Sequence, residues 1–179
     1  MAMTYSQMLQ QAIDKGTIKD AYGWFEKSFK DLSSLTGNAA LQKGGSRLTN
    51  FCTIGKMYLF HYDPKHKDTL PLYDRFPLIF PFNYASNGFL GLNFHYLPYM
   101  QRARLLDALS SLIVKSEGLT DTTRISLSYD AIRAVARSVP YDSCVKHYLN
   151  SHIRSRFLLI NPAEWSKALF LPLDNFVYK

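Results

Sequence analysis

The stretch from Phe76 to Met100 contains no Lys, Arg, Asp or Glu, and it limits the folds open to this chain more than any other feature. A run of that length could cross a membrane as a helix. However, residues such as Pro77, Pro81 and Asn87 interrupt it, and prolines and asparagines at this density argue against a membrane helix. The run must therefore be buried within a folded domain, and its aromatic and branched side chains favour β-structure.

Two strands and a tight turn are predicted within this run. Residues 76–83 and 89–96 are expected to pair as a hairpin, with Ser86-Asn87-Gly88 at the reversal. We expect Asn-Gly to supply the positive φ values that a primed turn requires. An aromatic segment, Met57–Tyr62, predicts a third strand, which ends at the turn pair Asp63-Pro64.

Helical patterns flank this sheet on both sides. Apolar spacing of three and four predicts helices over residues 4–14, 18–35, 98–115, 128–139 and 141–153. Short strands are expected at 156–160 and 168–171, and Asn161-Pro162-Ala163-Glu164 has the composition of a helix start. The predicted fold is α+β, a small antiparallel sheet or partly open barrel with flanking helices. We expect an N-terminal helical segment over residues 1–50 and a core domain over 51–179.

Composition fits a folded domain with a mildly basic surface or with acidic protein neighbours. Apolar residues make up 47% of the chain, and 12 Tyr with 12 Phe suit half-buried surfaces. The net charge of +7 comes from 21 basic and 14 acidic residues that form no basic run. Cys52 and Cys144 belong to no Cys-x-x-Cys pair, which favours buried thiols in a reducing compartment. The first residues lack the pattern of a signal peptide.

Two groups of residues have side chains that could form a catalytic site. His61, Asp63, His66 and His95 could converge on a metal ion, but their spacing matches no metal-binding signature. Cys144 and His147 lie three apart on a predicted helix, without a third orienting group. Ordinary structural roles explain both sets better. We therefore expect no enzymatic activity, no cofactor, and neither catalytic nor metal-ligating residues.

Nucleic-acid binding has more support in the sequence than catalysis does. Tyrosines and phenylalanines on a sheet could stack bases, with basic residues at Lys56, Lys65, Lys67 and Arg75 nearby. Residues 128–139, which carry Arg133 and Arg137, and the predicted helix 141–153 loosely resemble a helix-turn-helix. Against nucleic-acid binding, aromatic residues in a sheet more often form the core, and base-contacting helices usually carry more basic and amide side chains.

Two long segments resemble a known family. They are 55–98, which includes Tyr62-Asp63-Pro64-Lys65 and Gly88-Phe89-Leu90-Gly91, and 151–172, which includes Glu164-Trp165. Together they are similar to a family of small, uncharacterised proteins of contractile-tailed bacteriophages, of the T-even-like and cyanophage type. The resemblance covers roughly residues 50–175 and brings no catalytic motif. It implies a phage protein made in the host bacterial cytoplasm.

On this basis we expect a structural component of the virion in the tail, baseplate or neck, in many copies and acting through contacts with other virion proteins. The alternative is a phage nucleic-acid-binding protein in replication, packaging or transcription. Rigid loops lose little entropy on docking, so loop 63–75 and the hairpin tip are the expected contact surfaces. The candidate interaction residues are Tyr62, Pro64, Lys65, Lys67, Pro71, Tyr73, Arg75, Tyr84 and Asn87.

Overall fold

The computed structural model describes residues 3–11, 15–34, 47–70, 73–114, 118–139 and 144–171. Its α-helices are α1 (Tyr5–Gln11), α2 (Lys15–Ser34), α4 (Tyr99–Val114), α5 (Asp121–Arg137) and α7 (Trp165–Leu169). The strands are β1 (Leu48–Thr49), β2 (Met57–Leu59), β3 (Leu78–Ala85), β4 (Gly88–Asn93), β5 (Val145–Leu149) and β6 (Phe157–Ile160). Short 3₁₀ turns are η2 (Phe94–Tyr96), η3 (Asn150–His152) and η4 (Pro162–Glu164). None of the helices in these ranges is long and apolar enough to cross a bilayer.

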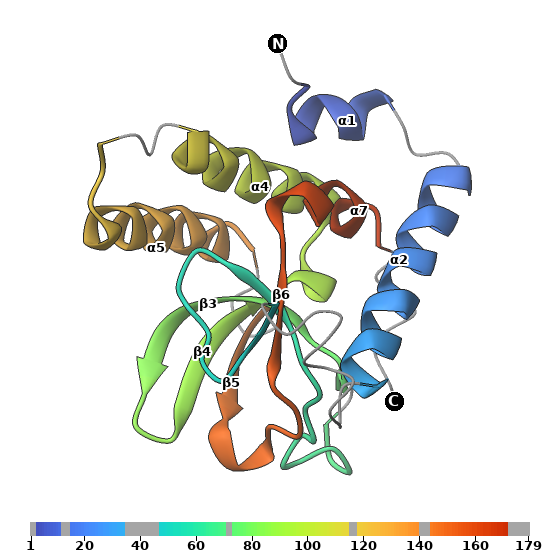
Figure 1. Cartoon of the computed structure of the whole chain (residues 1–179), viewed down its shortest axis with the longest axis vertical. Helices are drawn as coiled ribbons and strands as arrows, with labels where there is room; N and C mark the ends of the chain where they lie inside the picture. The colour runs from blue at the N-terminus through green and yellow to red at the C-terminus, as the bar shows by residue number, and fades with distance from the viewer. Residues whose placement is uncertain are drawn as a thin grey trace.

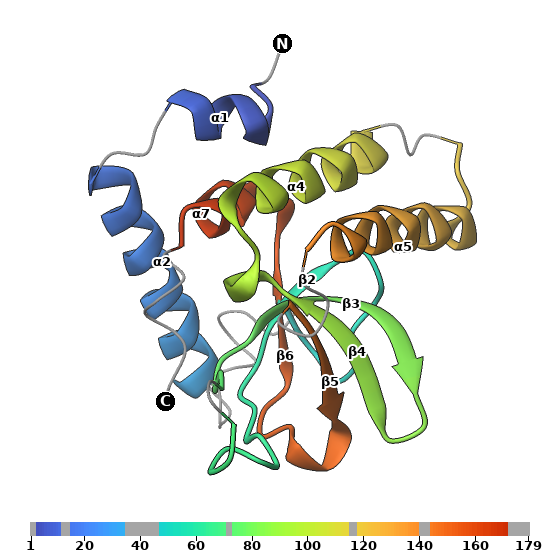
Figure 2. The same ribbon diagram turned by 180° about the vertical axis from the view of Figure 1, so that it is seen from behind.

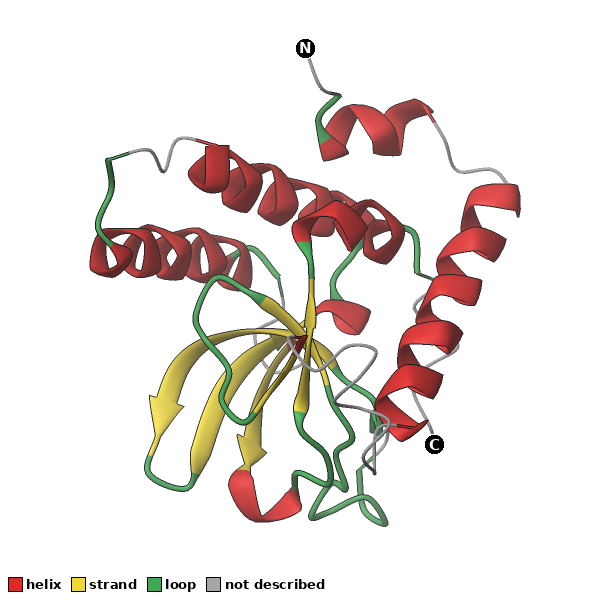
Figure 3. Ribbon diagram, in the orientation of Figure 1, coloured by secondary structure: helices red, strands yellow, loops and turns green. Residues whose placement is uncertain are grey.

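The six strands form one antiparallel sheet in the order β1-β6-β2-β3-β4-β5. Figures 1 and 2 show α4, α5 and α7 on one side of it, with α2 running down the flank. Figure 3 shows that the strands diverge below the helices and end in loops. The α+β prediction is confirmed, including an open sheet, while the boundary near residue 50 stays a prediction.

The sheet carries a core on each face because its side chains alternate. Met57 and Leu59 of β2 point into the larger core, which they share with the helices. Tyr58 and Phe60 belong to a second, mostly aromatic core on the opposite face. The rings of Phe89 on β4 and Phe157 on β6 are 5.9 Å apart, although β2 and β3 separate these strands in the sheet. The sheet must therefore curl around the second core.

Helix α1 is attached to the domain through a carboxylate. Asp107 of α4 accepts hydrogen bonds from the backbone N–H groups of Tyr5 and Ser6, at 2.6 and 3.1 Å. These are among the N–H groups that a helix start leaves without an internal partner. A residue far away in sequence therefore caps this helix.

The hairpin prediction is confirmed, but its physical basis is different. Ala85 pairs with Gly88, so Ser86 and Asn87 form the turn, and no residue there has a positive φ. Glycine is needed at position 88 because a Cβ there would lie 1.9 Å from the carbonyl oxygen of Tyr148. The close approach of β5, rather than the turn type, requires the glycine.

Two sequence predictions about the C-terminal half are wrong. The expected helix at 141–153 contains strand β5, which pairs along β4 from Gly88 to Leu92. Val145 and Tyr148 are both buried and lie three apart, so they imitate a helical period. The first half of the expected strand at 168–171 lies in α7, since the capping box at Asn161 and Glu164 starts a helical turn that continues to Leu169, and Phe170 is the C-cap.

Candidate nucleic-acid interface

Two connections between strands lie side by side at the end of the sheet away from α4, α5 and α7 (Figure 1). The first joins β2 to β3, and the second joins β5 to β6. Tyr62 pairs with Ile153 across them, and the backbone N–H of Asp63 donates to the carbonyl of His152 at 3.0 Å. The N–H of Arg154 donates to the carbonyl of His61 at 2.8 Å. The hydrogen bonds fix these two loops to each other as one surface.

Five cationic side chains, which we call the basic end, lie at this surface. They are Lys65, Lys67, Arg75, Lys146 and Arg154. Asp63 bridges two of them, Lys67 at 2.9 Å and Arg154 at 3.4 Å. Lys65 and Arg75 are exposed and have no ion pair with any of the described residues. Two exposed cations are thus available to an anionic partner.

A cavity of about 400 Å³, which we call the aromatic pocket, adjoins the basic end, and Lys65 and Lys146 line it. Four tyrosines line it together with basic, amide and carboxylate groups. Its lining includes Tyr62, Tyr73, Tyr96, Tyr148, Pro64, Lys65, His66, Asp74, Asn93, Lys146 and His147. Aromatic faces beside cations are the combination that binds single-stranded nucleic acid.

A hydrogen-bonded network forms the floor of this pocket. The Asp74 carboxylate accepts from His95 Nδ1 at 2.6 Å and from Asn93 Nδ2 at 3.2 Å. Asn93 Nδ2 also donates to the Tyr148 hydroxyl at 3.1 Å, and Asn93 Oδ1 accepts from the backbone N–H of His95. All four side chains are at least nine-tenths buried. The partners hold one another in place, which makes the floor rigid.

Burial favours the protonated phenols of Tyr96 and Tyr148 in the pocket. Burial, followed by the charge of Asp74, raises the pKa of Tyr96 and of Tyr148 above the ordinary value for tyrosine. The Lys146 ammonium lies 5.2 Å from the centre of the Tyr96 ring, a cation–π distance. Near neutral pH the pocket therefore presents hydroxyl donors and a cation.

Most of the expected contact residues in loop 63–75 lie at this site. Tyr62, Pro64, Lys65 and Tyr73 line the aromatic pocket, and Lys67 and Arg75 belong to the basic end. Pro71 lies outside the described residues. None of these placements tests a contact with a partner, so the interaction residues stay a prediction.

The hairpin tip lies beside the same end of the sheet. Asn87 accepts a hydrogen bond through its carbonyl from the N–H of Asn150, the first residue of η3. Tyr84 is 57% exposed, and its hydroxyl donates to the carbonyl of Cys52. The tip is therefore a neighbour of the basic end and does not line the aromatic pocket.

Sequence reasoning missed the residues contributed by β4, η2 and β5. Asn93 has the strand parity of Phe89 and could have been found from the predicted hairpin. Tyr96 has the opposite parity and lines the pocket because the strand gives way to η2 after Asn93. Lys146 and Tyr148 lie in a segment for which the sequence predicts a helix. That prediction does not place their side chains at the aromatic pocket.

The structure does not assemble the two catalytic candidates. His61 stacks on Phe76 at 4.9 Å, whereas His95 is buried against Asp74. Within the described ranges no three His, Cys, Asp or Glu side chains are placed to hold a metal ion. Cys144 is buried and His147 exposed, so the two do not share a helical face.

The helix-turn-helix hypothesis is also wrong, because the second helix is strand β5. Arg133 and Arg137 remain exposed on α5, and Arg133 lies 5.8 Å from the Tyr129 ring centre. Lys56 precedes β2 at the opposite end from loop 63–75. The cationic residues considered from the sequence are thus divided between separate surfaces, and only those of loop 63–75 belong to the basic end.

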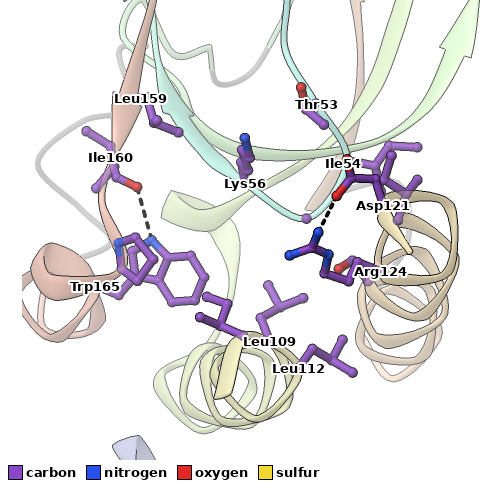
Figure 4. A pocket seen from close by; sticks show the side chains of 15 residues that line it. Thr53, Ile54, Lys56, Leu109, Leu112, Asp121, Arg124, Leu159, Ile160 and Trp165 are labelled. Carbon is purple, nitrogen blue, oxygen red and sulfur yellow. Dashed lines mark hydrogen bonds and ion pairs between the residues drawn. The ribbon is translucent and has the colours of Figure 1, made fainter. Parts of the chain in front are cut away.

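A second cavity, of about 480 Å³, lies between the loop before β2 and helices α4 and α5 (Figure 4). Leu109, Leu112 and Trp165 form an apolar wall, and Asp121 pairs with Arg124 on α5. Trp165 Nε1 donates to the carbonyl of Ile160, so this polar group is satisfied within the protein. Lys56 is the additional cation in this largely apolar lining. Compared with the aromatic pocket, this cavity has fewer groups suited to an anion.

Comparison with known proteins identifies a family. The model of the phage T4 terminal DNA protecting protein family matches residues 10–179. Neither the curated proteins nor the solved structures contain a significant match to the chain. The resemblance to a T4-like phage family is confirmed, but the association with uncharacterised structural proteins is not.

The family match contradicts the main functional expectation. A structural component of the tail, baseplate or neck has no support from a family described by DNA protection. Contacts with other virion proteins in a symmetric assembly are likewise without support. The match favours the nucleic-acid-binding alternative.

Proposed function

The chain belongs to the phage T4 terminal DNA protecting protein family, and from this premise we propose that it binds the ends of linear phage DNA and shields them from exonucleases. The family match over residues 10–179 carries the proposal, since it spans nearly the whole chain. The basic end is the surface that we assign to DNA.

The chemistry of this surface supports binding to a phosphate backbone. Lys65 and Arg75 extend into solvent from a loop that hydrogen bonds anchor to the sheet. Phosphate contacts by such residues release condensed counterions, so affinity falls steeply with salt. A net charge of +7 adds long-range attraction.

We propose that protection is steric and requires neither catalysis nor a cofactor. An exonuclease must reach the terminal phosphodiester, and a protein seated on the end blocks that access. The floor groups of the aromatic pocket are hydrogen-bonded to one another, an arrangement that suits holding a ligand. We further propose that the protein meets its DNA in the host cytoplasm, and that any place in the virion follows from attachment to DNA.

Digestion of linear duplex DNA by a purified exonuclease tests the proposal. The protein should slow digestion of an open duplex at concentrations that leave a site-specific endonuclease unaffected on the same DNA. Binding should favour an open duplex over a dumbbell whose two ends are closed by hairpins. Raising the salt concentration should weaken both binding and protection.

A matched pair of triple variants assigns the surface. Lys65→Gln, Arg75→Gln and Arg154→Gln together should reduce protection and lower the salt slope of binding by up to about three. Lys19→Gln, Lys27→Gln and Lys30→Gln remove the same charge from exposed positions on α2 and should preserve more protection. Equal digestion with and without protein would overturn the proposed function. Equal losses in the two variants would remove the assignment to the basic end.

A further inference from the structure

The aromatic pocket has the chemistry of a nucleotide site, and we propose that it holds the unpaired terminal nucleotide of a DNA end. This inference rests on the proposed function and adds to it the part of the DNA that is recognised. The basic end would grip the flanking phosphates, while the pocket would recognise that the strand stops there.

The size of the pocket limits what can enter. Its volume of about 400 Å³ lies near the lower part of the range for small-molecule sites, about 300–1,000 Å³. A duplex cannot enter such a space, whereas one nucleotide suits it. The nucleotide must therefore leave the base-pair stack, as target bases do in enzymes that act on a flipped base.

The need to leave the stack explains a preference for ends. An interior nucleotide must break its pair and two stacking contacts, and it remains tied to the backbone on both sides. A terminal nucleotide has one stacking neighbour and one backbone connection, so extrusion costs less. A pocket that accepts only extruded nucleotides thus discriminates an end from continuous duplex without reading its sequence.

The pocket walls provide separate partners for the base and the phosphate. Tyr73 is half-buried at the wall and offers an aromatic surface for stacking. Lys146 covers the Tyr96 ring at 5.2 Å, and Lys65 lies on the loop at the same pocket. These two ammonium groups are the anion partners that a nucleotide phosphate needs.

The floor adds a polar contact at depth. The Tyr148 hydroxyl accepts from Asn93, and its own hydrogen is donated to none of the described residues. Tyr148 lines the pocket although it is 3% exposed, and in the proposed complex its hydroxyl donates to a base or sugar oxygen. Because Asp74 and Asn93 hold the floor together, this donor has a fixed position.

Photocrosslinking with 5-iododeoxyuridine tests the contact directly. One duplex carries the probe at the terminal position of a strand, and a second carries it ten positions inside. With wild-type protein, the terminal probe should crosslink to a pocket tyrosine, identified by mass spectrometry, and the interior probe should not. A pattern of crosslinks that is the same for both probes would overturn the proposal.

Binding by pocket variants supplies a second readout. Tyr73→Ala and Lys146→Met should reduce the preference for open duplex over closed dumbbell, with Tyr73→Ala losing about fivefold to 150-fold, the range of base–aromatic stacking. Phe51→Ala is the control, because Phe51 is 82% exposed and outside the pocket. Thermal unfolding should show that each variant remains folded.

The outcomes separate the two proposals. Wild-type protein that protects ends while both pocket variants keep the full preference would overturn the terminal-nucleotide site and leave the proposed function standing. Wild-type protein with neither end preference nor protection would overturn both. A free deoxynucleoside monophosphate should compete with open duplex only at millimolar concentration, because it lacks the flanking phosphates. Micromolar competition would instead assign the pocket to free nucleotides.

Discussion

Asp74 Oδ2 and His95 Nδ1 lie 2.6 Å apart, although 21 positions separate the two residues in sequence. Asp74 comes from the loop before β3 and His95 from η2, directly after β4. Their contact joins the loop that bears the basic end to the sheet, and it underlies the floor of the aromatic pocket.

Replacing Asp74 should destabilise the fold as a whole. Asp74→Asn places an amide where the carboxylate accepts from His95, Asn93 and the N–H of Phe76. Removing one partner from a buried charged network should cost about 3 kcal/mol. Urea unfolding measures the loss in the free energy of unfolding. The control is Asp68→Asn at an exposed position, whose free energy of unfolding should lie within about 0.5 kcal/mol of the wild-type value. Equal stability of the two variants would contradict the role given to the floor.

Arg102 is the second buried charge to test. Its guanidinium donates to backbone carbonyls before α4 and around the end of α7, including Leu97 at 2.8 Å and Leu171 at 2.6 Å. Burial lowers the pKa of Arg102 to about 10, so it stays charged at neutral pH. Arg102→Met would leave these carbonyls without their donor and should cost about 3 kcal/mol. Arg104→Met, exposed on the same helix, is the control for chemical denaturation.

Gly88 and Gly23 should respond to alanine in opposite directions. A Cβ at position 88 would lie 1.9 Å from the Tyr148 carbonyl oxygen, so Gly88→Ala must push β5 away from β4 and should cost about 2 kcal/mol or more. A Cβ at position 23 meets nothing within 4 Å, and Gly23→Ala should stabilise α2 by about 0.5–1 kcal/mol. Melting temperatures that move the same way would refute this contrast.

His61 should make stability depend on pH. Burial, with the charges of Arg75 and Arg154, lowers the pKa of His61 in the folded protein. At pH values between the pKa of His61 in the folded protein and its ordinary pKa near 6.5, the unfolded chain binds more protons than the folded protein does. Stability should therefore be complete above about pH 6.5 and decline as pH falls through the folded pKa. Urea unfolding from pH 5 to 8 should show that the free energy of unfolding of His61→Gln depends less on pH than that of the wild type. Parallel curves of unfolding free energy against pH for the two proteins would rule this contribution out.

The sequence predicts the centre of this fold better than its C-terminal half. The sequence predicts the hairpin and α4 because few alternative structures fit their long apolar patterns and the turn between the two strands. Strand β5 was not, because Val145 and Tyr148 are spaced like a helix and only the unpaired edge of β4 determines that they form a strand. The candidate site divides in the same way. Its loop residues could be selected from sequence, whereas Lys146, Tyr148 and the Asp74–His95 contact depend on tertiary structure.

The curled sheet also bears on how this protein should lose its function. One layer of backbone separates the aromatic core from the larger core beneath the helices, so neither core can loosen without moving a wall of the other. The loops of the basic end are continuations of those same strands. Damage under the helices, far from the basic end, should therefore be transmitted along the strands and disrupt the basic end as part of a single cooperative transition.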